Sequence, residues 1–214
     1  MNQLIWFGPM VLILAYTLGS LPTGYILGKT LRGIDLRDHG SGSTGATNAL
    51  RVMGKKAGLV VLIVDIAKGI IAVLVAQYLS RIILDMPQHS WIPWLSVLAG
   101  LSAVVGHSNP VWLSFRGGKS VATGLGILLA LSWPVGLSAF GIFGICLSLS
   151  RIVSLSSISA AIAVSGLMIV LRQPLAYILF GLAAGGYVVW RHRSNIKRLM
   201  DGVEPRLGQS SPQK

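Results

Sequence analysis

The sequence predicts an all-α integral membrane protein with seven transmembrane helices. Three observations lead to this fold class. Hydrophobic residues make up 53% of the 214 residues, and only 11% are charged, against about 25% in an ordinary soluble domain. The mean hydropathy is +0.71. The apolar residues form long runs separated by short polar segments, and about 20 mostly apolar residues are enough to cross a bilayer. We expect one membrane domain over residues 1–214.

The first predicted span covers residues 4–27, and a polar, glycine-rich loop follows it up to about Lys56. Pro134 and Pro174 mark turns between later spans, because proline cannot continue a helix. The spacing Gly181-x-x-x-Gly185 in the last span favours close helix packing within the bundle over dimerisation. The remaining six spans are predicted at residues 57–79, 91–105, 121–133, 134–150, 153–171 and 175–190.

The distribution of basic residues predicts the orientation. The net charge is +12, which in a soluble protein suggests nucleic-acid binding. Here, every Lys and Arg except Arg81, Arg172 and Lys68 falls on the same side of the predicted spans. Basic loops stay in the cytoplasm, so we expect the N-terminus outside, the C-terminus in the cytoplasm and no nucleic-acid partner. Residues 204–214 are predicted to form a disordered tail.

A motif between the third and fourth spans carries the sequence Phe-Arg-Gly-Gly-Lys-Ser at residues 115–120. Glycines let a backbone approach a ligand closely, and a following helix N-terminus favours an anion. The motif is typical of a phosphate receptor at the membrane surface. The alternative is a basic loop that only orients the chain. The P-loop pattern is incomplete and no strand precedes it, so we reject a nucleotide-hydrolysing site.

Another motif lies in the first cytoplasmic loop, with glycines at 40, 42 and 45 and hydroxyl residues between them. Asn48 and Arg51 follow, three residues apart, on one face of a short helix. We interpret the loop as an oxyanion cradle, with a flexible hinge as the alternative. A dinucleotide-binding fold is excluded because no βαβ unit is possible here.

Two further segments on the same side carry polar side chains at helical spacing. Ser154 and Ser157 share one face at the start of the sixth span, either to contact a ligand or to cap and pack the helix. His192 and Asn195 share a face after the seventh span. An amphipathic helix on anionic lipid would explain the neighbouring arginines, but not the pairing of His192 with Asn195.

Asp65 and Lys68 lie within the second span, one helical turn apart. Charged residues are costly in lipid, so we expect the two to pair with each other, with a role in a site as the alternative. No cluster of carboxylates suited to Mg²⁺ is present, and Cys146 is the single cysteine. We therefore expect neither a metal nor a cofactor.

Three ordered motifs resemble those of the bacterial acyl-phosphate:glycerol-3-phosphate acyltransferase family. They are Gly-Ser-Gly-Ser-Thr-Gly-Ala-Thr-Asn-Ala-Leu-Arg at 40–51, Gly-His-x-x-Pro…Phe-Arg-Gly-Gly-Lys at 106–119, and His-x-x-Asn-Ile-x-Arg-Leu-x-x-Gly-x-Glu at 192–204. The resemblance covers the whole chain and implies a membrane acyltransferase of phospholipid biosynthesis. It would transfer a fatty acyl group from acyl-phosphate to the C1 hydroxyl of glycerol-3-phosphate, giving lysophosphatidic acid and phosphate.

The resemblance also implies roles for individual residues. Ser157, His192 and Asn195 would orient the glycerol-3-phosphate or the acyl carbonyl, together with Lys119 as the catalytic set. The phosphate groups would be held by Ser41, Arg51, Lys119, Gly117 and Gly118. The loops would be supported by Asn48, Gly42, Gly45 and His107. The proton acceptor is either His192 or, as we favour, an oxygen of a substrate phosphate.

The expected partners are glycerol-3-phosphate, acyl-phosphate and membrane lipid, for a monomer in the bacterial inner membrane whose active site faces the cytoplasm. One rival is an organic-phosphate transporter that uses Asp65 and Lys68 as a coupling pair. Another is a non-catalytic binder of anions or lipid headgroups. All three polar motifs lie on one face, whereas a transporter needs a path to both faces, so the sequence favours the enzyme.

Overall fold

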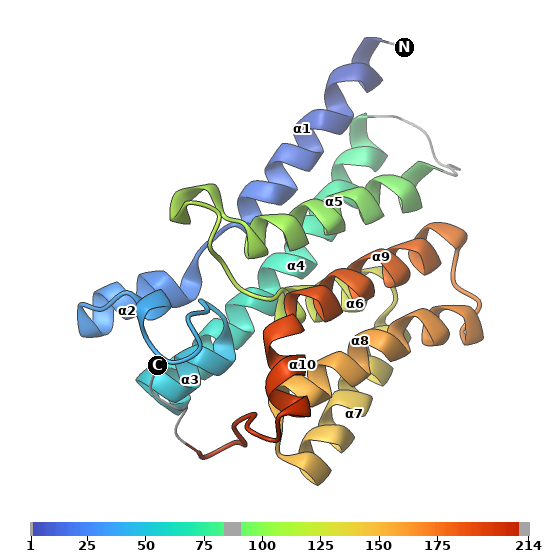
Figure 1. Cartoon of the computed structure of the whole chain (residues 1–214). Helices are drawn as coiled ribbons and strands as arrows, with labels where there is room; N and C mark the ends of the chain where they lie inside the picture. Colours follow the sequence, from blue (N-terminus) through green and yellow to red (C-terminus); the bar gives the residue numbers. More distant parts are fainter. Residues whose placement is uncertain (1, 84–90, 210–214) are drawn as a thin grey trace.

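The computed structural model describes residues 2–83 and 91–209, and this part of the chain is helical without strands. Five segments are long and apolar enough to cross a membrane, and two shorter apolar helices, α6 and α9, accompany them. Figure 1 shows the helices. In chain order, the elements are α1 (Asn2–Gly19), α2 (Thr23–Arg32), η1 (Leu36–Asp38), α3 (Ala46–Met53), α4 (Lys55–Ile83), α5 (Trp91–Ser108), η2 (Val111–Leu113), α6 (Val121–Leu131), α7 (Trp133–Ser150), α8 (Val153–Val170), α9 (Leu175–Arg191) and α10 (Arg193–Met200).

The first predicted span, residues 4–27, is not a single helix. Helix α1 ends at Gly19 and α2 begins at Thr23. Pro22 explains the break, because a proline disfavours the helical conformation of the residue before it, here Leu21. Helix α2 ends at Gly33, which has a φ of 67° and adopts the left-handed conformation common after helices. The break redirects the chain so that α2 lies beside η1 and α3.

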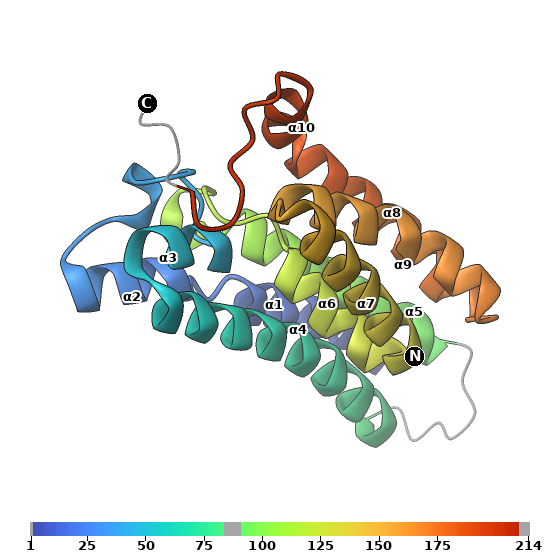
Figure 2. The ribbon, with the colours of Figure 1, turned by 90° about the horizontal axis from the view of Figure 1, so that it is seen from below.

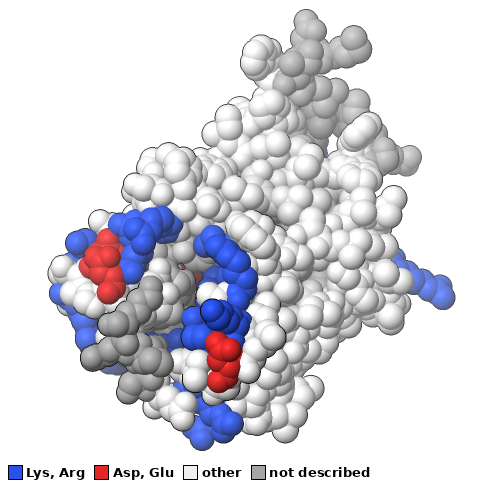
Figure 3. Space-filling view, viewed as in Figure 1, with Lys and Arg blue, Asp and Glu red and all other residues white. Residues whose placement is uncertain are grey.

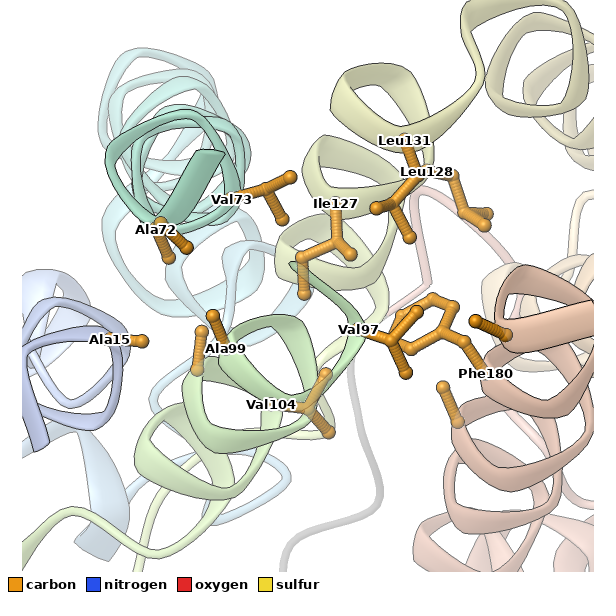
Figure 4. Close-up of a cluster of buried hydrophobic side chains, with 14 of the residues drawn as sticks. Ala15, Ala72, Val73, Val97, Ala99, Val104, Ile127, Leu128, Leu131 and Phe180 are labelled. Atoms are coloured by element: carbon orange, nitrogen blue, oxygen red, sulfur yellow. The ribbon is translucent and has the colours of Figure 1, made fainter. Parts of the chain in front are cut away.

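The core of the bundle is formed by α1, α4, α5, α6, α7, α8 and α9, and Figure 4 shows part of it. Ile127 and Phe180 are almost completely buried there. Small residues bring the backbones together: a side chain at Gly69 would collide with the carbonyl of Thr123, and one at Gly126 with that of Ile66. Helices α4 and α6 are therefore in backbone contact, as expected in membrane bundles.

The Gly181-x-x-x-Gly185 pair packs α9 against α8 within the chain. A Cβ at Gly185 would lie 2.7 Å from the carbonyl oxygen of Ala161, and one at Gly181 would lie 3.3 Å from Cγ1 of Val164. This is the intramolecular packing that the spacing predicted.

Helices α2, α3 and α10 lie at the same end of the molecule in both views (Figures 1 and 2). Lys and Arg side chains gather on this end, and most of the remaining surface in this view carries no charge (Figure 3). The polar motifs on which the sequence analysis depends are thus brought to one end of the bundle.

The predicted disordered tail, residues 204–214, begins too early. Glu204 is buried, and the backbone N–H of Leu207 donates a 2.7 Å hydrogen bond to the carbonyl of Arg151. The composition of the segment does not show that the Glu204 carboxylate has hydrogen-bond donors on two helices. Residues 210–214 lie outside the described residues.

Candidate active site

Asn48 stabilises the loop of the first motif, residues 40–51, which is called the first motif loop below. Its Oδ1 accepts a 2.8 Å hydrogen bond from the N–H of Ser41. Its Nδ2 donates to three backbone carbonyls, those of Leu36, His39 and Ser43. The side chain is 1% exposed. Together with the hydrogen bond from the N–H of Gly42 to the carbonyl of His39, the Asn48 side chain gives the loop one defined shape rather than that of a flexible hinge.

The glycines of this loop allow its turns. Gly40 and Gly42 have φ angles of 59° and 68°, and a Cβ at Gly40 would collide with Oδ1 of Asn48. The N–H of Gly42 donates to the carbonyl of His39, and that of Gly45 to Oγ of Ser43. Gly42 and Gly45 thus shape the loop, and both of these N–H groups are used within it.

The loop of the second motif, residues 106–119, is called the second motif loop, and it is packed on His107. The N–H of Gly117 donates to the carbonyl of Ser108 at 3.0 Å, and the N–H of Gly118 donates to that of His107 at 3.1 Å. A Cβ at Gly118 would collide with Nε2 of His107. These two glycines were expected to offer their N–H groups to a phosphate. The structure instead uses both N–H groups inside the loop, because the chain must turn tightly over the imidazole.

Ser120 joins this loop to helix α6. Its φ is 60°, a left-handed conformation that is unfavourable for a residue with a side chain. Two hydrogen bonds hold it there: Ser120 Oγ donates to the carbonyl of Val104 at 2.8 Å and lies 2.6 Å from Oγ of Ser108. Lys119, the preceding residue, therefore has a fixed backbone.

Substitution of Gly118 by alanine is expected to raise the KM for an anionic substrate at least tenfold, with a smaller loss in kcat. The added methyl group would collide with the buried imidazole of His107, so the loop would have to lift and carry Lys119 with it. Steady-state kinetics would show the change. Gly166→Ala on α8 is the control, because nothing lies within 4 Å of a Cβ there. Equal KM values for the two variants would contradict this account of the loop.

Lys119 begins a hydrogen-bonded chain that joins the second and third motifs to Ser154 of α8. Its Nζ donates to Oδ1 of Asn195 at 2.6 Å, and Nδ2 of Asn195 donates to Oε1 of Glu204 at 2.7 Å. The same Glu204 oxygen accepts from Oγ of Ser154 at 2.7 Å, and Oε2 accepts from Nε of Arg198 at 2.6 Å. One carboxylate thus fixes Asn195, which in turn directs the amine of Lys119.

Glu204 and Arg191 bond to predicted site residues, although the sequence analysis assigns neither of them a role. For Glu204, the available signal is its position as the last charged residue of the third motif. Nη2 of Arg191 donates a 2.7 Å hydrogen bond to the carbonyl of Gly118 and so connects α9 to the second motif loop. Its only signal was a basic residue in the last turn of a helix.

Lys119 and His192 have different charge states in the site: the first is a cation and the second is a neutral imidazole. Burial, together with the nearby charge of Arg198, lowers the pKa of Lys119 to about 8, and Glu204 partly opposes this shift. Burial lowers the pKa of His192 to about 4. Its Nδ1 lies 2.7 Å from the carbonyl of Val188; since a carbonyl only accepts, Nδ1 carries the proton and Nε2 is an acceptor. His192 is therefore neutral at pH 7.

The other two charged groups follow the same logic. Burial lowers the pKa of the Arg51 guanidinium, which still remains charged at any physiological pH. Burial would raise the pKa of Glu204, but the hydrogen bonds from Ser154, Asn195 and Arg198 outweigh it and lower the pKa. Glu204 is therefore a carboxylate at pH 7.

A cavity of about 470 Å³ lies among these residues. Its polar part includes nine of the predicted site residues. Its apolar part is formed by side chains of α4, α6, α7, α8 and α9, among them Phe140, Phe143 and Val164. The predicted residues that line it are Ser41, Gly45, Asn48, Arg51, His107, Lys119, Ser157, His192 and Asn195.

A smaller cavity of about 210 Å³ adjoins the first and is lined by polar groups, including Arg191 and Arg193. It shares Ser41 and Lys119 with the large cavity and takes in Gly42 and Gly117. Gly118 is the one predicted residue that lines neither cavity. Ser157 lies in the large cavity with its hydroxyl proton donated to the carbonyl of Val153 at 2.8 Å. Its oxygen can still accept a hydrogen bond.

In the described part of the chain, no group of three His, Cys, Asp or Glu side chains is arranged to hold a metal ion. Asp65 and Lys68 form the ion pair that the sequence predicted, with Lys68 Nζ 2.8 Å from Oδ1 of Asp65.

Comparisons with known proteins agree on one family. The chain matches the glycerol-3-phosphate acyltransferase family over residues 9–202. It is similar to proteins named glycerol-3-phosphate acyltransferase from Trichormus variabilis, with 56% identity over 93% of this chain and 91% of that one, and from Acaryochloris marina, with 58% identity over 94% and 92% of the two chains.

Two solved structures of PlsY (YgiH), described as an integral membrane glycerol 3-phosphate acyltransferase, share the fold. The glycerol 3-phosphate form has a TM-score of 0.84 and 38% sequence identity, covering 94% of this chain and 96% of that chain. The lysophosphatidic acid form has a TM-score of 0.80 at the same identity. The likeness extends over almost the full length of both chains, so this multi-pass, all-helical membrane protein belongs to the glycerol-3-phosphate acyltransferase family.

Proposed function

We propose that the protein transfers a fatty acyl group from acyl-phosphate to the C1 hydroxyl of sn-glycerol-3-phosphate. The products are 1-acyl-glycerol-3-phosphate, which is lysophosphatidic acid, and inorganic phosphate. The observation that carries this proposal is the cavity of about 470 Å³, which joins a cationic, hydrogen-bonding end to an apolar wall. A phosphorylated polar substrate suits the first part and a fatty chain the second. The family membership supports the same acceptor.

The two kinds of substrate fit different groups in the cavity. Arg51 and Lys119, with the hydroxyl of Ser41, supply charge-assisted hydrogen bonds to phosphate oxygens. The acyl chain lies along the apolar side chains of α7 and α8, such as Phe140, Phe143 and Val164. Asn195 is held by Glu204 and directs Lys119, so the cation has a set position before any substrate binds. Such preorganisation lowers the barrier because no reorientation is needed during reaction.

The reaction needs one proton acceptor, and the magnitudes favour the substrate. The C1 hydroxyl oxygen attacks the acyl carbonyl carbon, the bond from that carbon to the phosphate oxygen breaks, and the hydroxyl proton must leave. The second pKa of a phosphate group is about 6, whereas the pKa of the His192 imidazole is lowered to about 4. The departing phosphate is the stronger base and takes the proton. Before the attack, Nε2 of His192 accepts a hydrogen bond from the C1 hydroxyl of glycerol-3-phosphate and orients that hydroxyl. The proton moves to the phosphate oxygen only as the new bond to the carbonyl carbon forms.

We also propose the seven-span arrangement with an outer N-terminus, a cytoplasmic C-terminus and a location in the bacterial inner membrane. The five long candidate spans support this arrangement, with the shorter apolar helices α6 and α9 as the two further crossings it needs. The basic end of the bundle (Figure 3) supports a cytoplasmic active site. The transporter alternative finds no support in Asp65 and Lys68, which are paired with each other and tied to the backbone.

The test is an assay of purified protein in lipid with acyl-phosphate and glycerol-3-phosphate, following phosphate release and the acylated product by mass spectrometry. We expect equal amounts of phosphate and 1-acyl-glycerol-3-phosphate, and no product when acyl-CoA replaces acyl-phosphate. Product formed from acyl-CoA alone would reject the proposed donor. Phosphate release that does not depend on glycerol-3-phosphate would reject the acyl transfer.

The pKa of Lys119 predicts how activity depends on pH. Because this pKa is about 8, the amine is charged below pH 8 and neutral above it. We expect kcat/KM for glycerol-3-phosphate to fall as the pH rises through about 8. Lys119→Arg is the matched control, since a guanidinium stays charged and should remove this decline. A decline of the same size in the arginine variant would assign it to another group.

A further inference from the structure

The ion pair between Asp65 and Lys68 has no part in the reaction described above, yet it lies within a predicted span. Both side chains are at most 4% exposed, and they are one helical turn apart on α4. Charges inside a membrane bundle are rare and tend to mark a function. Stability alone does not explain the pair, because apolar residues of the same size often replace a buried ion pair without loss of stability.

Lys68 reaches the break between α1 and α2. Its Nζ donates a 3.0 Å hydrogen bond to the carbonyl of Leu21, in the segment between Gly19 and Thr23 where the chain turns from α1 into α2. Helix α2 begins directly after this point, and a Cβ at Gly24 would collide with the carbonyl of Thr44. The direction in which the chain leaves Leu21 therefore sets the place of the first motif loop.

Asp65 reaches toward the second motif loop. Its Oδ1 lies 3.6 Å from Nδ1 of His107, a buried ring nitrogen with no hydrogen-bond partner among the described residues. Gly118 rests directly on the other ring nitrogen of His107 and also donates to its carbonyl. The Asp65 carboxylate thus lies beside one edge of the His107 imidazole, and the Gly118-Lys119 backbone is packed on the same ring.

We propose that the Asp65–Lys68 pair positions the two phosphate-binding loops relative to each other from within the bundle. The two loops also meet at the surface, where Nη1 of Arg37 donates to the carbonyl of Leu113 at 2.9 Å. The buried pair is the second connection, and it fixes the spacing between Ser41 on one loop and Lys119 on the other. Asp65 and Lys68 act through Leu21 and His107 and are positioning residues. This inference rests on the proposed function.

The experiment compares two double variants that lack the charges. In D65L/K68M the hydrogen bonds are lost, whereas D65N/K68Q keeps an acceptor and a donor at the same places. We expect D65L/K68M to keep its Tm and to raise the KM for glycerol-3-phosphate at least tenfold, with a smaller effect on kcat. D65N/K68Q should stay within threefold of the wild-type KM. Ser80→Ala is the control, since Ser80 is buried on the same helix and its hydroxyl donates to the carbonyl of Ala76 within that helix.

A KM for D65L/K68M within threefold of the wild type would overturn the proposal. It would also fall if D65N/K68Q were as impaired as D65L/K68M, since that result would make the charges, not the hydrogen bonds, essential. Should D65L/K68M not accumulate as folded protein, Lys68→Met is compared with Lys68→Arg in the same assay. An unchanged KM for Lys68→Met would then decide against the proposal.

A distance measurement separates this inference from the proposed function. Spin labels on D38C and R116C, two exposed sites, report the spacing of the loops in a Cys146→Ser background. We expect a broader distance distribution in D65L/K68M than in the wild type or in Ser80→Ala. If the wild-type protein acylates no glycerol-3-phosphate, the proposed function fails while this measurement still decides the positioning role. Identical distributions would remove that role.

Discussion

Lys119→Ala is expected to lower turnover about 10²–10³-fold, the scale for one lost contact to a charge that develops in the transition state. Lys119 is a half-buried cation that lines both cavities and is directed by Asn195 at 2.6 Å. In the proposed reaction the departing phosphate gains charge beside this amine. Removal of the amine leaves that charge to Arg51, on a different helix. Single-turnover measurements of phosphate release would give the loss.

Lys197→Ala is the matched control for this result. Lys197 lies on α10 at the same basic end, but it is exposed and takes part in none of the hydrogen bonds of the site. Its removal changes the net charge by the same amount and should leave turnover within a factor of two. If Lys119→Ala also stayed within a factor of two, the role assigned to Lys119 would be wrong. Lys119→Arg should retain part of the activity because it keeps the charge.

Glu204→Ala is expected to reduce both activity, by at least 100-fold, and thermal stability. The change leaves Nδ2 of Asn195 and Oγ of Ser154 without their acceptor, and each buried polar group without a partner costs about 1–3 kcal/mol. Asn195 is then free to turn, and Lys119 loses its direction. Parallel measurements of Tm and of kcat/KM in detergent would show the two effects together.

Asp201→Asn serves as the control for Glu204→Ala, because Asp201 is an exposed carboxylate three residues earlier in the chain. It should leave both Tm and kcat/KM unchanged. Glu204→Gln should fall between the two, since its amide oxygen still accepts from Asn195 or Ser154 but its nitrogen meets a donor on Arg198. A Glu204→Ala variant with a wild-type Tm and normal kinetics would show that the carboxylate has no function in the site.

The sequence was sufficient to predict the helical membrane fold, because the apolar runs and the one-sided basic residues are local features. It also led to Asn48 and Lys119, whose polar side chains lie beside glycines in loops. It could not predict that the N–H groups of Gly117 and Gly118 are used by the carbonyls of Ser108 and His107. That outcome depends on the path of α5 behind the loop, which no local pattern records.

The break at Pro22 and the burial of Glu204 were missed for related reasons. Proline inside an apolar run is compatible with a kinked helix as well as with a break, and the choice here depends on the contact of α2 with η1 and α3. A carboxylate in a polar tail is expected to be solvated. Only the folded bundle places Ser154 of α8 and Asn195 of α10 where they reach Glu204.

Glu204 and Asn195 follow the last long helix, whereas Ser41 and Lys119 precede α6. The ribosome therefore releases both phosphate loops well before it releases the residues that direct Lys119. A nascent chain inserted up to α9 already contains most of the apolar cavity, but its lysine is not yet oriented. On the proposed function, acyl transfer can therefore begin only after translation has passed residue 204.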